Sequence, residues 1–311
     1  MSIVVVTGAR GYIARALARL LANKGYSLRL VSRVQNDLCD EESWHTLLRG
    51  ADAVVHLSSR TDLQAAETNP TEDRIFNVEP VRVLARAAER CGRAVPVIFA
   101  SSTSIAGTAH SNPVNEQTLD RPCSVYDRHK LECETILQEA TKRRVLRACS
   151  LRLATVYGYG NGIGSVNPNR GVLNTMMYRA VNGQPLTLYG DGSPIRDFTH
   201  VNDVCNAFHL ALAKQAVCDG GHYIVATGRG HTLAEAFRFI KQEAQRLIGR
   251  DIEIRHIAEP AHLHPIERSN FVGDASAFQR LTAWRADIDL RSGIRDCLQQ
   301  LVANAAIAGA G

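Results

Sequence analysis

The chain begins with a short apolar run that leads directly into a glycine-rich turn. Residues 3–6 read Ile-Val-Val-Val, and β-branched residues in a run of this length are typical of a buried strand. Residues 7–14 read TGARGYIA, and an apolar-periodic segment follows that ends near Lys24 and Gly25, where a glycine commonly terminates a helix. The sequence therefore predicts a buried strand that passes through a tight turn into the N-terminus of a helix.

A turn of this kind suits a bound phosphate group. Gly8 allows the tight turn, Gly11 lets the backbone approach a pyrophosphate, and the small Ala14 lets the helix pack closely on the strand. The free N–H groups and the dipole of the helix N-terminus attract the anion. An ordinary strand-to-helix turn is the alternative, but we interpret the segment as a dinucleotide-binding turn. Its predicted cofactor-binding residues are Gly8, Arg10, Gly11, Tyr12 and Ile13.

Composition is that of an ordinary globular protein and excludes several functions. Of the 311 residues, 45% are hydrophobic and 22% are charged, and the net charge of +5 is too small for a nucleic-acid-binding surface. We expect neither a secretory leader nor a membrane span, because the first apolar run has only strand length and no 18 apolar residues run together. The eight cysteines contain no C-x-x-C pair, so we expect reduced thiols, no metal site and a cytoplasmic enzyme.

The end of the second predicted strand bears on the choice of cofactor. Residues 26–32 form this strand, and Ser32 and Arg33 stand at its end. An acidic residue there would accept the ribose 2′-hydroxyl of NAD, whereas a cation can hold the 2′-phosphate of NADP. Arg10 in the glycine turn is a second cation. We expect NADP(H) or NAD(H), with NADP slightly favoured, unless both arginines are simply solvated.

Strands and helices alternate along the rest of the chain. Apolar runs predict strands over 51–57, 94–100 and 151–158, and amphipathic patterns predict helices over 44–48, 72–91 and 126–141. Pro80 should kink the second of these helices or split it in two. Such alternation is typical of parallel sheets. We predict an α/β protein, a Rossmann doubly wound parallel sheet with a smaller, mostly C-terminal α/β substrate domain.

This interpretation divides the chain into two domains. Residues 1–165, with about 195–227, form the NAD(P)-binding Rossmann domain, and residues 166–194 and 228–311 form the substrate-binding domain. The Gly- and Asn-rich loop 159–171 is expected to leave the sheet and line the substrate.

A tyrosine and a lysine lie four residues apart at the start of the helix predicted over 126–141. Side chains at this spacing share one helix face, so the Tyr126 hydroxyl and the Lys130 ammonium can point into the same cleft. A nearby cation lowers the pKa of a phenol from about 10 toward the working range of a general base. The pattern gains weight because it follows the glycine turn and the serine-rich strand end at 101–104.

Together these motifs resemble the extended short-chain dehydrogenase/reductase family, in particular its nucleotide-sugar epimerase/dehydratase group. The matching residues, in chain order, are Thr7-Gly8-x-x-Gly11-x-x-Ala14, Asp52-x-Val54-x-His56-Leu57, Ser102 with Tyr126 and Lys130, Leu151-Arg152 with Val156-Tyr157-Gly158, and Arg196-Asp197-Phe198 with His200-Val201 and Asp203. They extend over nearly the whole chain. Each motif is weak by itself, but their common order makes chance an implausible explanation.

The resemblance implies roles for individual residues. Tyr126 would be the acid/base on a sugar hydroxyl, Lys130 would hold the nicotinamide ribose, and Ser102 would hydrogen-bond the reacting oxygen. A guanidinium at Arg196 would grip the nucleotide diphosphate. The further cofactor-binding residues are Arg33, Asp37, Leu38 and Leu57, and the substrate-binding residues are Ser102, Thr103, Ser104, Asn174, Arg196 and Arg268.

Position 104 narrows the chemistry that the resemblance implies. Dehydratases and decarboxylases of the group carry a glutamate there and the fucose-type epimerase-reductase a cysteine, whereas this chain has Ser104. A serine is a poor acid/base near neutral pH. What remains is redox chemistry at the sugar C4, either a UDP-glucose 4-epimerase-like reaction or an NADPH-dependent reduction of a nucleotide-4-keto-sugar. A non-catalytic NADP-binding regulator is less favoured, because Tyr126 and Lys130 are both present.

The segment between Ser32 and Asp37 is short, so the third strand that usually stands there is expected to be compressed.

The resemblance also implies a homodimer, formed through the helices of residues 72–91 and 127–141.

Overall fold

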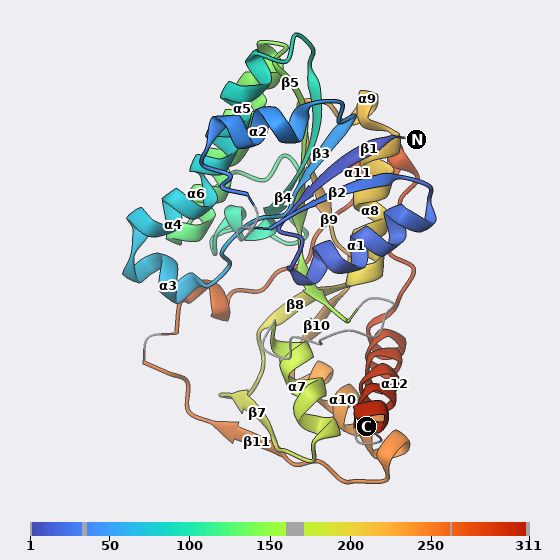
Figure 1. The fold of residues 1–311 in the computed structure, drawn as a ribbon. Coiled ribbons are helices and arrows are strands. Elements are labelled where there is room, and N and C mark those ends of the chain that lie inside the picture. The colour runs from blue at the N-terminus through green and yellow to red at the C-terminus, as the bar shows by residue number, and fades with distance from the viewer. Residues whose placement is uncertain (1, 33–35, 160–170, 262, 309–311) are drawn as a thin grey trace.

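The larger part of the molecule is built on a parallel sheet. The computed structural model describes residues 2–32, 36–159, 171–261 and 263–308 (Figure 1). Six strands lie in the order β2-β1-β3-β4-β5-β9, and all neighbouring pairs are parallel. Their bounds are Ile3–Thr7 for β1, Ser27–Val31 for β2, Ala53–His56 for β3, Val95–Ser102 for β4, Leu146–Leu153 for β5 and His222–Val225 for β9. The predicted doubly wound sheet is confirmed.

Helices cover both faces of this sheet because the strands are apolar on both sides. In β1, Val4 and Val6 pack on one face and Val5 on the other, as alternation along a strand requires. The first face carries α1 (Tyr12–Asn23), α8 (Val201–Ala213) and α11 (Ser276–Thr282), and the second carries α2 (Glu41–Leu48), α5 (Glu79–Glu89) and α6 (Val125–Lys142) (Figure 1). The short helices α3 (Leu63–Thr68), α4 (Pro70–Asn77) and α9 (Gln215–Cys218) complete this part.

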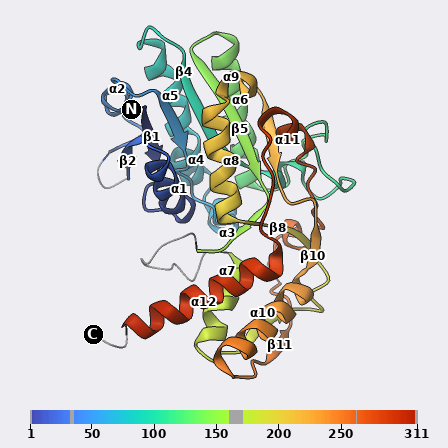
Figure 2. The same ribbon diagram turned by 90° about the vertical axis from the view of Figure 1, so that its right-hand side faces the viewer.

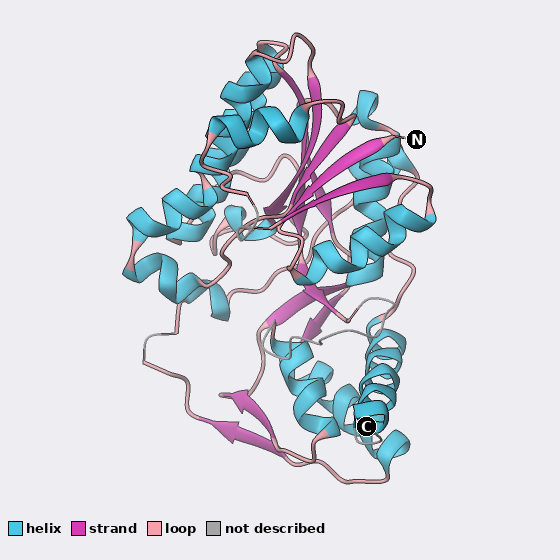
Figure 3. Cartoon of the chain, viewed as in Figure 1, coloured by secondary structure: helices cyan, strands magenta, loops and turns pink. Residues whose placement is uncertain are grey.

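A smaller group of elements lies beyond the carboxyl edge of the sheet (Figures 2 and 3). It holds a three-stranded sheet in the order β10-β8-β6 and a two-stranded parallel sheet of β11 and β7. The bounds are Thr155–Tyr157 for β6, Leu186–Tyr189 for β7, Ile195–His200 for β8, Gly230–Thr232 for β10 and Ile254–Ile257 for β11. Helices α7 (Val172–Val181), α10 (Leu233–Ile248) and α12 (Leu290–Ala308) enclose its apolar core.

Two elements differ from the sequence prediction. The single strand expected over 151–158 is two strands, because β5 begins at Leu146 and β6 belongs to the other sheet. The chain changes sheets at Ala154, whose N–H still donates to the Val225 carbonyl at 3.1 Å. The helix expected over 72–91 is split, as Pro80 suggested: α4 ends at Asn77 and α5 starts at Glu79 with Pro80 in its first turn.

The expected compression after β2 is seen in the sheet order, in which no strand lies beyond β2 in the described part of the chain. Residues 36–40 contain no strand, so β2 is the last strand at its side of the sheet within the described chain. The first turn of α2 is capped by the Asp40 carboxylate, which accepts from Ser43 N–H at 2.8 Å.

One segment predicted for the smaller domain packs on the larger sheet. Phe278 and Trp284 are fully buried in the cluster formed by α1, α8 and the first face of the sheet. The Trp284 indole N–H also donates to the Asp203 carbonyl in α8 at 2.9 Å. The chain between α10 and α12 therefore returns to the Rossmann layer before it ends in the smaller group.

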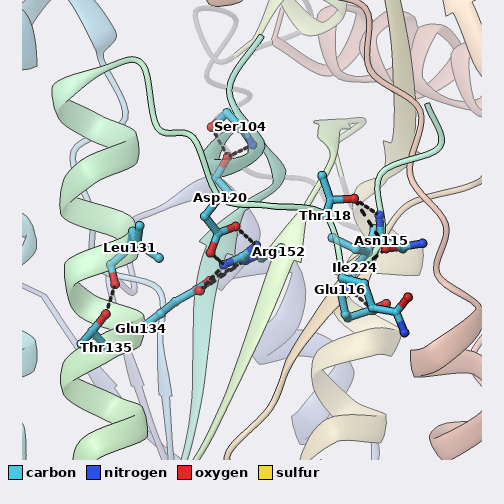
Figure 4. Close-up of polar contacts among 12 residues, drawn as sticks. Ser104, Asn115, Glu116, Thr118, Asp120, Leu131, Glu134, Thr135, Arg152 and Ile224 are labelled. Atoms are coloured by element: carbon cyan, nitrogen blue, oxygen red, sulfur yellow. Dashed lines mark hydrogen bonds and ion pairs between the residues drawn. The ribbon is translucent and has the colours of Figure 1, made fainter. Parts of the chain in front are cut away.

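A buried guanidinium joins α6 to the sheet (Figure 4). Arg152 in β5 is 2% exposed and contacts Glu134 of α6 through Nη2 at 2.6 Å. Its two terminal nitrogens also donate to both oxygens of Asp120, at 2.6 and 2.9 Å. Fork-to-carboxylate pairing of this kind fixes orientation as well as distance. The helix that carries Tyr126 and Lys130 is thereby held against β5.

We expect Glu134→Ala to lower the free energy of unfolding by about 3 kcal/mol, because it removes one partner from a buried charge. Urea denaturation measures the change. The matched control is Glu132→Ala on the same helix, whose side chain is 34% exposed in its pairs with Arg74 and Arg82 and should cost no more than about 1 kcal/mol. Equal losses in the two variants would contradict the anchoring role of Arg152.

Candidate active site

A cleft of about 420 Å³ lies at the carboxyl ends of the parallel strands, where doubly wound sheets bind their ligands. Its walls come from the glycine turn after β1, the end of β3, the end of β4, the start of α6 and the β5–β6 junction. The lining residues include Gly8, Gly11, Tyr12, Ile13, Leu57, Ser102, Tyr126 and Lys130. The structure therefore brings together residues that the sequence predicted for cofactor binding and for catalysis.

The glycine turn has room for a phosphate and none for side chains. Gly8 has a φ of +70°, and a Cβ there would lie 2.9 Å from Ser58 N. A Cβ on Gly11 would lie 2.8 Å from the Gly8 carbonyl oxygen, which accepts the Gly11 N–H at 2.7 Å. Helix α1 starts at Tyr12 without a side-chain cap, so its first N–H groups face the cleft as donors for an anion. These features fit the pyrophosphate of a dinucleotide.

The Thr7 hydroxyl ties the end of β1 to the end of β3. Its oxygen accepts from the N–H groups of Leu57 and Ser58, both at 3.1 Å. Its own proton is then left for His56 Nδ1, also at 3.1 Å, so this ring nitrogen carries no proton. Burial, with a smaller effect of the Lys130 charge, lowers the pKa of His56 to about 3. His56 is a neutral packing residue that helps to place Leu57.

The residues expected at the adenosine end contact one another and their neighbours. The Asp37 carboxylate accepts from Cys39 N–H at 2.9 Å, and Leu38 is 5% exposed with its carbonyl oxygen accepting from the Trp44 indole at 2.8 Å. Arg10 is exposed. Arg33 lies outside the described residues. The roles of these residues toward a cofactor stay predictions.

Tyr126 and Lys130 project from the first turns of α6 into the cleft. Ser124 caps this helix by accepting from Asp127 N–H at 3.0 Å. The Lys130 ammonium donates to the Ala100 carbonyl oxygen at the end of β4 at 2.8 Å and lies 5.7 Å from the centre of the Tyr126 ring. The shared helix face predicted from their spacing is present.

The electrostatics of the pair differ from the expectation. Burial lowers the pKa of Lys130 to about 8. Burial also raises the pKa of Tyr126 well above its ordinary value, and the carboxylates of Asp127 and Asp73 raise it further. A nearby lysine was expected to lower the phenol pKa, but the loss of solvent and two nearby carboxylates raise it. In this structure the Tyr126 hydroxyl keeps its proton at neutral pH.

Three adjacent polar side chains at the end of β4 have different partners. Ser102 lines the cleft. Thr103, the first residue of the 3-10 helix η1 (Thr103–Ala106), is 7% exposed and donates to the Leu153 carbonyl at 3.1 Å. Ser104 donates to the Asp127 carboxylate and lies 2.6 Å from the Ser102 hydroxyl. The substrate-binding roles of Thr103 and Ser104 stay predictions.

Asp127 was not selected from the sequence. Ser124 and Asp127 have the spacing of a helix N-terminal capping motif, which explains an acidic residue here without any further function. In the structure only Ser124 caps the helix, and the fully buried Asp127 carboxylate contacts Ser104 instead. No local pattern links two residues 23 positions apart.

The three remaining predicted substrate residues make contacts within the protein. Asn174 is 1% exposed and bonds the backbone of Gly158 through both amide atoms, at 2.8 and 3.2 Å. Arg268 pairs with Glu259 at 2.8 Å on the surface. The Arg196 guanidinium donates to backbone carbonyls, among them Glu267 at 2.7 Å and Ser269, and so ties β8 to the 3-10 helix η2 (Pro265–Arg268). Residues 160–170 of the expected substrate loop lie outside the described residues.

Two other features of the described residues bear on function. No cluster of three or more His, Cys, Asp or Glu side chains among them could hold a metal ion. No helix in the described ranges is long and apolar enough to cross a membrane.

Comparison with known families identifies the chain. The model of the NAD dependent epimerase/dehydratase family matches residues 4–226, from β1 to the residue after β9. The chain belongs to this family. The match spans the glycine turn, Ser102, Tyr126 and Lys130, so the nicotinamide cofactor for which the family is named fits the cleft described above.

Individual relatives support the same family. The UDP-glucose 4-epimerase of Azospirillum brasilense is 26% identical over 290 residues, which cover 84% of this chain and 82% of that protein. The solved UDP-glucose 4-epimerase of Thermotoga maritima, with UDP-glucose, is 22% identical with a TM-score of 0.85 over 98% of this chain and 99% of that one. RMD from Pseudomonas aeruginosa, complexed with NADPH, is 22% identical with a TM-score of 0.81 over 97% and 99%. The two structures share the fold.

We expect Gly11→Ala to weaken NAD(H) and NADP(H) binding by at least about tenfold, because the new Cβ would displace the Gly8 carbonyl from the turn that holds the pyrophosphate. Calorimetric titration measures the affinity. Gly25→Ala, after the other end of α1, is the control, since its φ of +84° strains an alanine but its surroundings are open. It should cost about 1 kcal/mol of stability and leave the affinity unchanged. Unchanged binding in Gly11→Ala would exclude this turn as the cofactor site.

Proposed function

We propose that this protein is an NAD(P)-dependent 4-epimerase of a nucleotide-sugar, similar to UDP-glucose 4-epimerase. The observation that carries the proposal is the cleft in which a phosphate-binding glycine turn stands beside Ser102, Tyr126 and Lys130. Relatives that cover most of the chain are named UDP-glucose 4-epimerases. Ser104 stands where the related dehydratases have an acid/base, which limits the chemistry to redox exchange at one carbon.

The roles of the chain's own residues follow from their places in the cleft. A bound nicotinamide supplies hydride exchange with the sugar carbon. Tyr126 would take the proton of the C4 hydroxyl and return it, and Ser102 would hydrogen-bond the same oxygen. The Lys130 ammonium, held by the Ala100 carbonyl at 2.8 Å, would stabilise the phenolate form of Tyr126 electrostatically and bind the ribose hydroxyls.

A reductase of nucleotide-4-keto-sugars is the second candidate. The raised pKa of Tyr126 keeps a proton on the phenol, which suits proton donation to a carbonyl oxygen better than proton abstraction. The structural neighbour RMD was solved with NADPH, and the exposed Arg10 is a cation beside the glycine turn. These observations favour NADP(H) over NAD(H) and a net reduction.

Substrate and assembly complete the proposal. Arg196 and Arg268 would bind the nucleotide diphosphate after exchanging their present partners, and Thr103, Ser104 and Asn174 would lie near the sugar. The homodimer would form through the helices of residues 72–91 and 127–141, which are α4, α5 and α6 on the outer face of the larger domain (Figure 1).

The nucleotide that the protein carries discriminates between the two reactions. The protein is purified, denatured and its released nucleotide identified, and UDP-glucose is then offered without added cofactor. Retained NAD(P) together with formation of UDP-galactose supports the epimerase. An empty protein that consumes NADPH against a UDP-4-keto-sugar supports the reductase. Failure of both assays would contradict the proposed C4 chemistry.

We expect Tyr126→Phe to lower kcat by about 10²- to 10⁴-fold, because the phenol is the group that exchanges the proton, while cofactor affinity stays within about twofold. Steady-state kinetics and cofactor titration provide the two readouts. Tyr178→Phe serves as control, since this side chain is 40% exposed on α7 and should leave kcat unchanged. Wild-type turnover in Tyr126→Phe would contradict the catalytic assignment.

A further inference from the structure

A buried carboxylate in α4, that of Asp73, contacts the helix that carries Tyr126 and Lys130. Asp73 is 3% exposed, and its Oδ2 lies 2.6 Å from Nδ1 of His129, the residue before Lys130 in α6. An ionised carboxylate only accepts, so the His129 ring donates through Nδ1. Neither member of the pair is among the described residues that line the cleft. The pair therefore joins two helices from behind the cleft.

A second contact, one turn further along both helices, repeats this pairing. The Cys133 thiol in α6 donates to the Asn77 carbonyl oxygen in α4 at 3.3 Å. Residues 73 and 77 are four positions apart, as are residues 129 and 133, so each pair shares one face of its helix. The two contacts together fix how α4 lies against α6 (Figure 1).

The Asn77 side chain extends the contact to the loop after β3. Its amide nitrogen donates to both Asp73 carboxylate oxygens, at 2.9 and 3.0 Å, and to the Arg60 carbonyl oxygen at 3.1 Å. Its amide oxygen accepts from Arg60 N–H at 2.8 Å and from the Ser59 hydroxyl at 3.0 Å. The reversed amide would set its oxygen against the carboxylate and its nitrogen against the Arg60 N–H. Asp73 therefore fixes the orientation in which Asn77 holds the loop.

The loop held in this way is a wall of the cleft. Ser59 and Thr61 line the cleft, as does Lys130. A continuous path of hydrogen bonds runs from the loop through Asn77 and Asp73 to His129, the neighbour of Lys130. The separation of these two parts of the cleft is thus fixed by polar contacts between α4 and α6.

We propose that Asp73 and His129 are positioning residues that hold the loop after β3 at a fixed distance from Lys130, and thereby set the affinity of the cleft for the nicotinamide half of the cofactor. The inference rests on the proposed function, in which Lys130 binds the ribose hydroxyls. Without the pair, α4 and its loop can shift on α6. Water that enters the space can donate to the carboxylate, but it is not attached to the helix.

Helix capping does not explain the Asp73 side chain. The cap of α4 is Asn69, which accepts from Glu72 N–H at 3.1 Å. Burying a carboxylate is costly unless donors surround it, and an apolar pair would join two helices at no greater cost. An apolar pair would not orient the Asn77 amide, and this is what the buried carboxylate supplies.

The test compares ligands that reach different parts of the cleft. NADH, NADPH and ADP are titrated calorimetrically into wild type and variants, since ADP can occupy the glycine turn without reaching Lys130. We expect His129→Ala and Asp73→Ala to weaken binding of the dinucleotide that wild type prefers by at least about fivefold. The affinity for ADP should stay within about twofold of wild type.

Conservative variants separate the link from mere burial. His129→Asn places an amide nitrogen near the position of Nδ1 and should restore the dinucleotide affinity. Asp73→Asn keeps an acceptor for Asn77 and can donate to His129 after the ring changes its tautomer, so it should also bind like wild type. Leu137→Ala is the stability control. Leu137 is 1% exposed two turns further along α6, so this variant should have a lower Tm and unchanged affinity.

The outcomes separate the inference from the function on which it rests. Wild-type dinucleotide affinity in both alanine variants would overturn the positioning role and leave the proposed function standing. Equal losses in His129→Asn and His129→Ala would also overturn it, because the donor to Asp73 is kept in the first. Weaker dinucleotide binding in Leu137→Ala, or an equal loss for ADP, would assign the effect to general destabilisation and overturn it too. A wild type that binds neither NADH nor NADPH would overturn both the inference and the proposed function.

Discussion

The parallel direction of the central strands is the constraint on which the site depends. Because β1, β3 and β4 run the same way, the turns that follow them open at one edge of the sheet. This edge collects a glycine turn after β1, a backbone wall after β3 and a polar strand end after β4. The Thr7 hydroxyl joins the first two by accepting from Leu57 and Ser58. The glycines matter only because the sheet places them at this edge.

Helix α6 reaches the same edge from the face of the sheet and must be held in position by other means. Arg152 holds it near its middle through Glu134, and the Lys130 ammonium holds its first turns through the Ala100 carbonyl. The Asp127 carboxylate adds a third contact, to Ser104 in η1. Two of these attachments lead to β4 or the turn after it. The distance between Ser102 and Tyr126 is therefore set by polar contacts as well as by apolar packing.

Local patterns predicted the parts of the site that lie within one turn or one helix. The glycine turn is specified by a few consecutive residues, and Tyr126 and Lys130 by the period of an α-helix. The family resemblance supplied Ser102, which no periodicity singles out. Contacts between distant segments were missed: Asp127 has the spacing of a capping motif, Arg152 was matched only as part of a family motif, and Ala154 was expected inside one strand and not at the boundary between two. The roles of these three residues depend on contact partners that lie far away in the sequence and come close only in the folded chain.

The protonation of Tyr126 bears on the choice between epimerase and reductase. Below about pH 8 Lys130 is charged and favours the phenolate, and above it this cation is lost, while burial and two carboxylates keep the phenol pKa high throughout. Raising the pH therefore removes the stabilising charge before the phenol can ionise. A reductase needs nothing more, because it only donates a proton to a carbonyl oxygen. An epimerase must also abstract one, and for this the cleft needs a further positive charge near the phenol, which an oxidised nicotinamide ring carries and a reduced one lacks. In the proposed epimerase, Tyr126 would therefore act as a base with oxidised cofactor and as an acid with reduced cofactor.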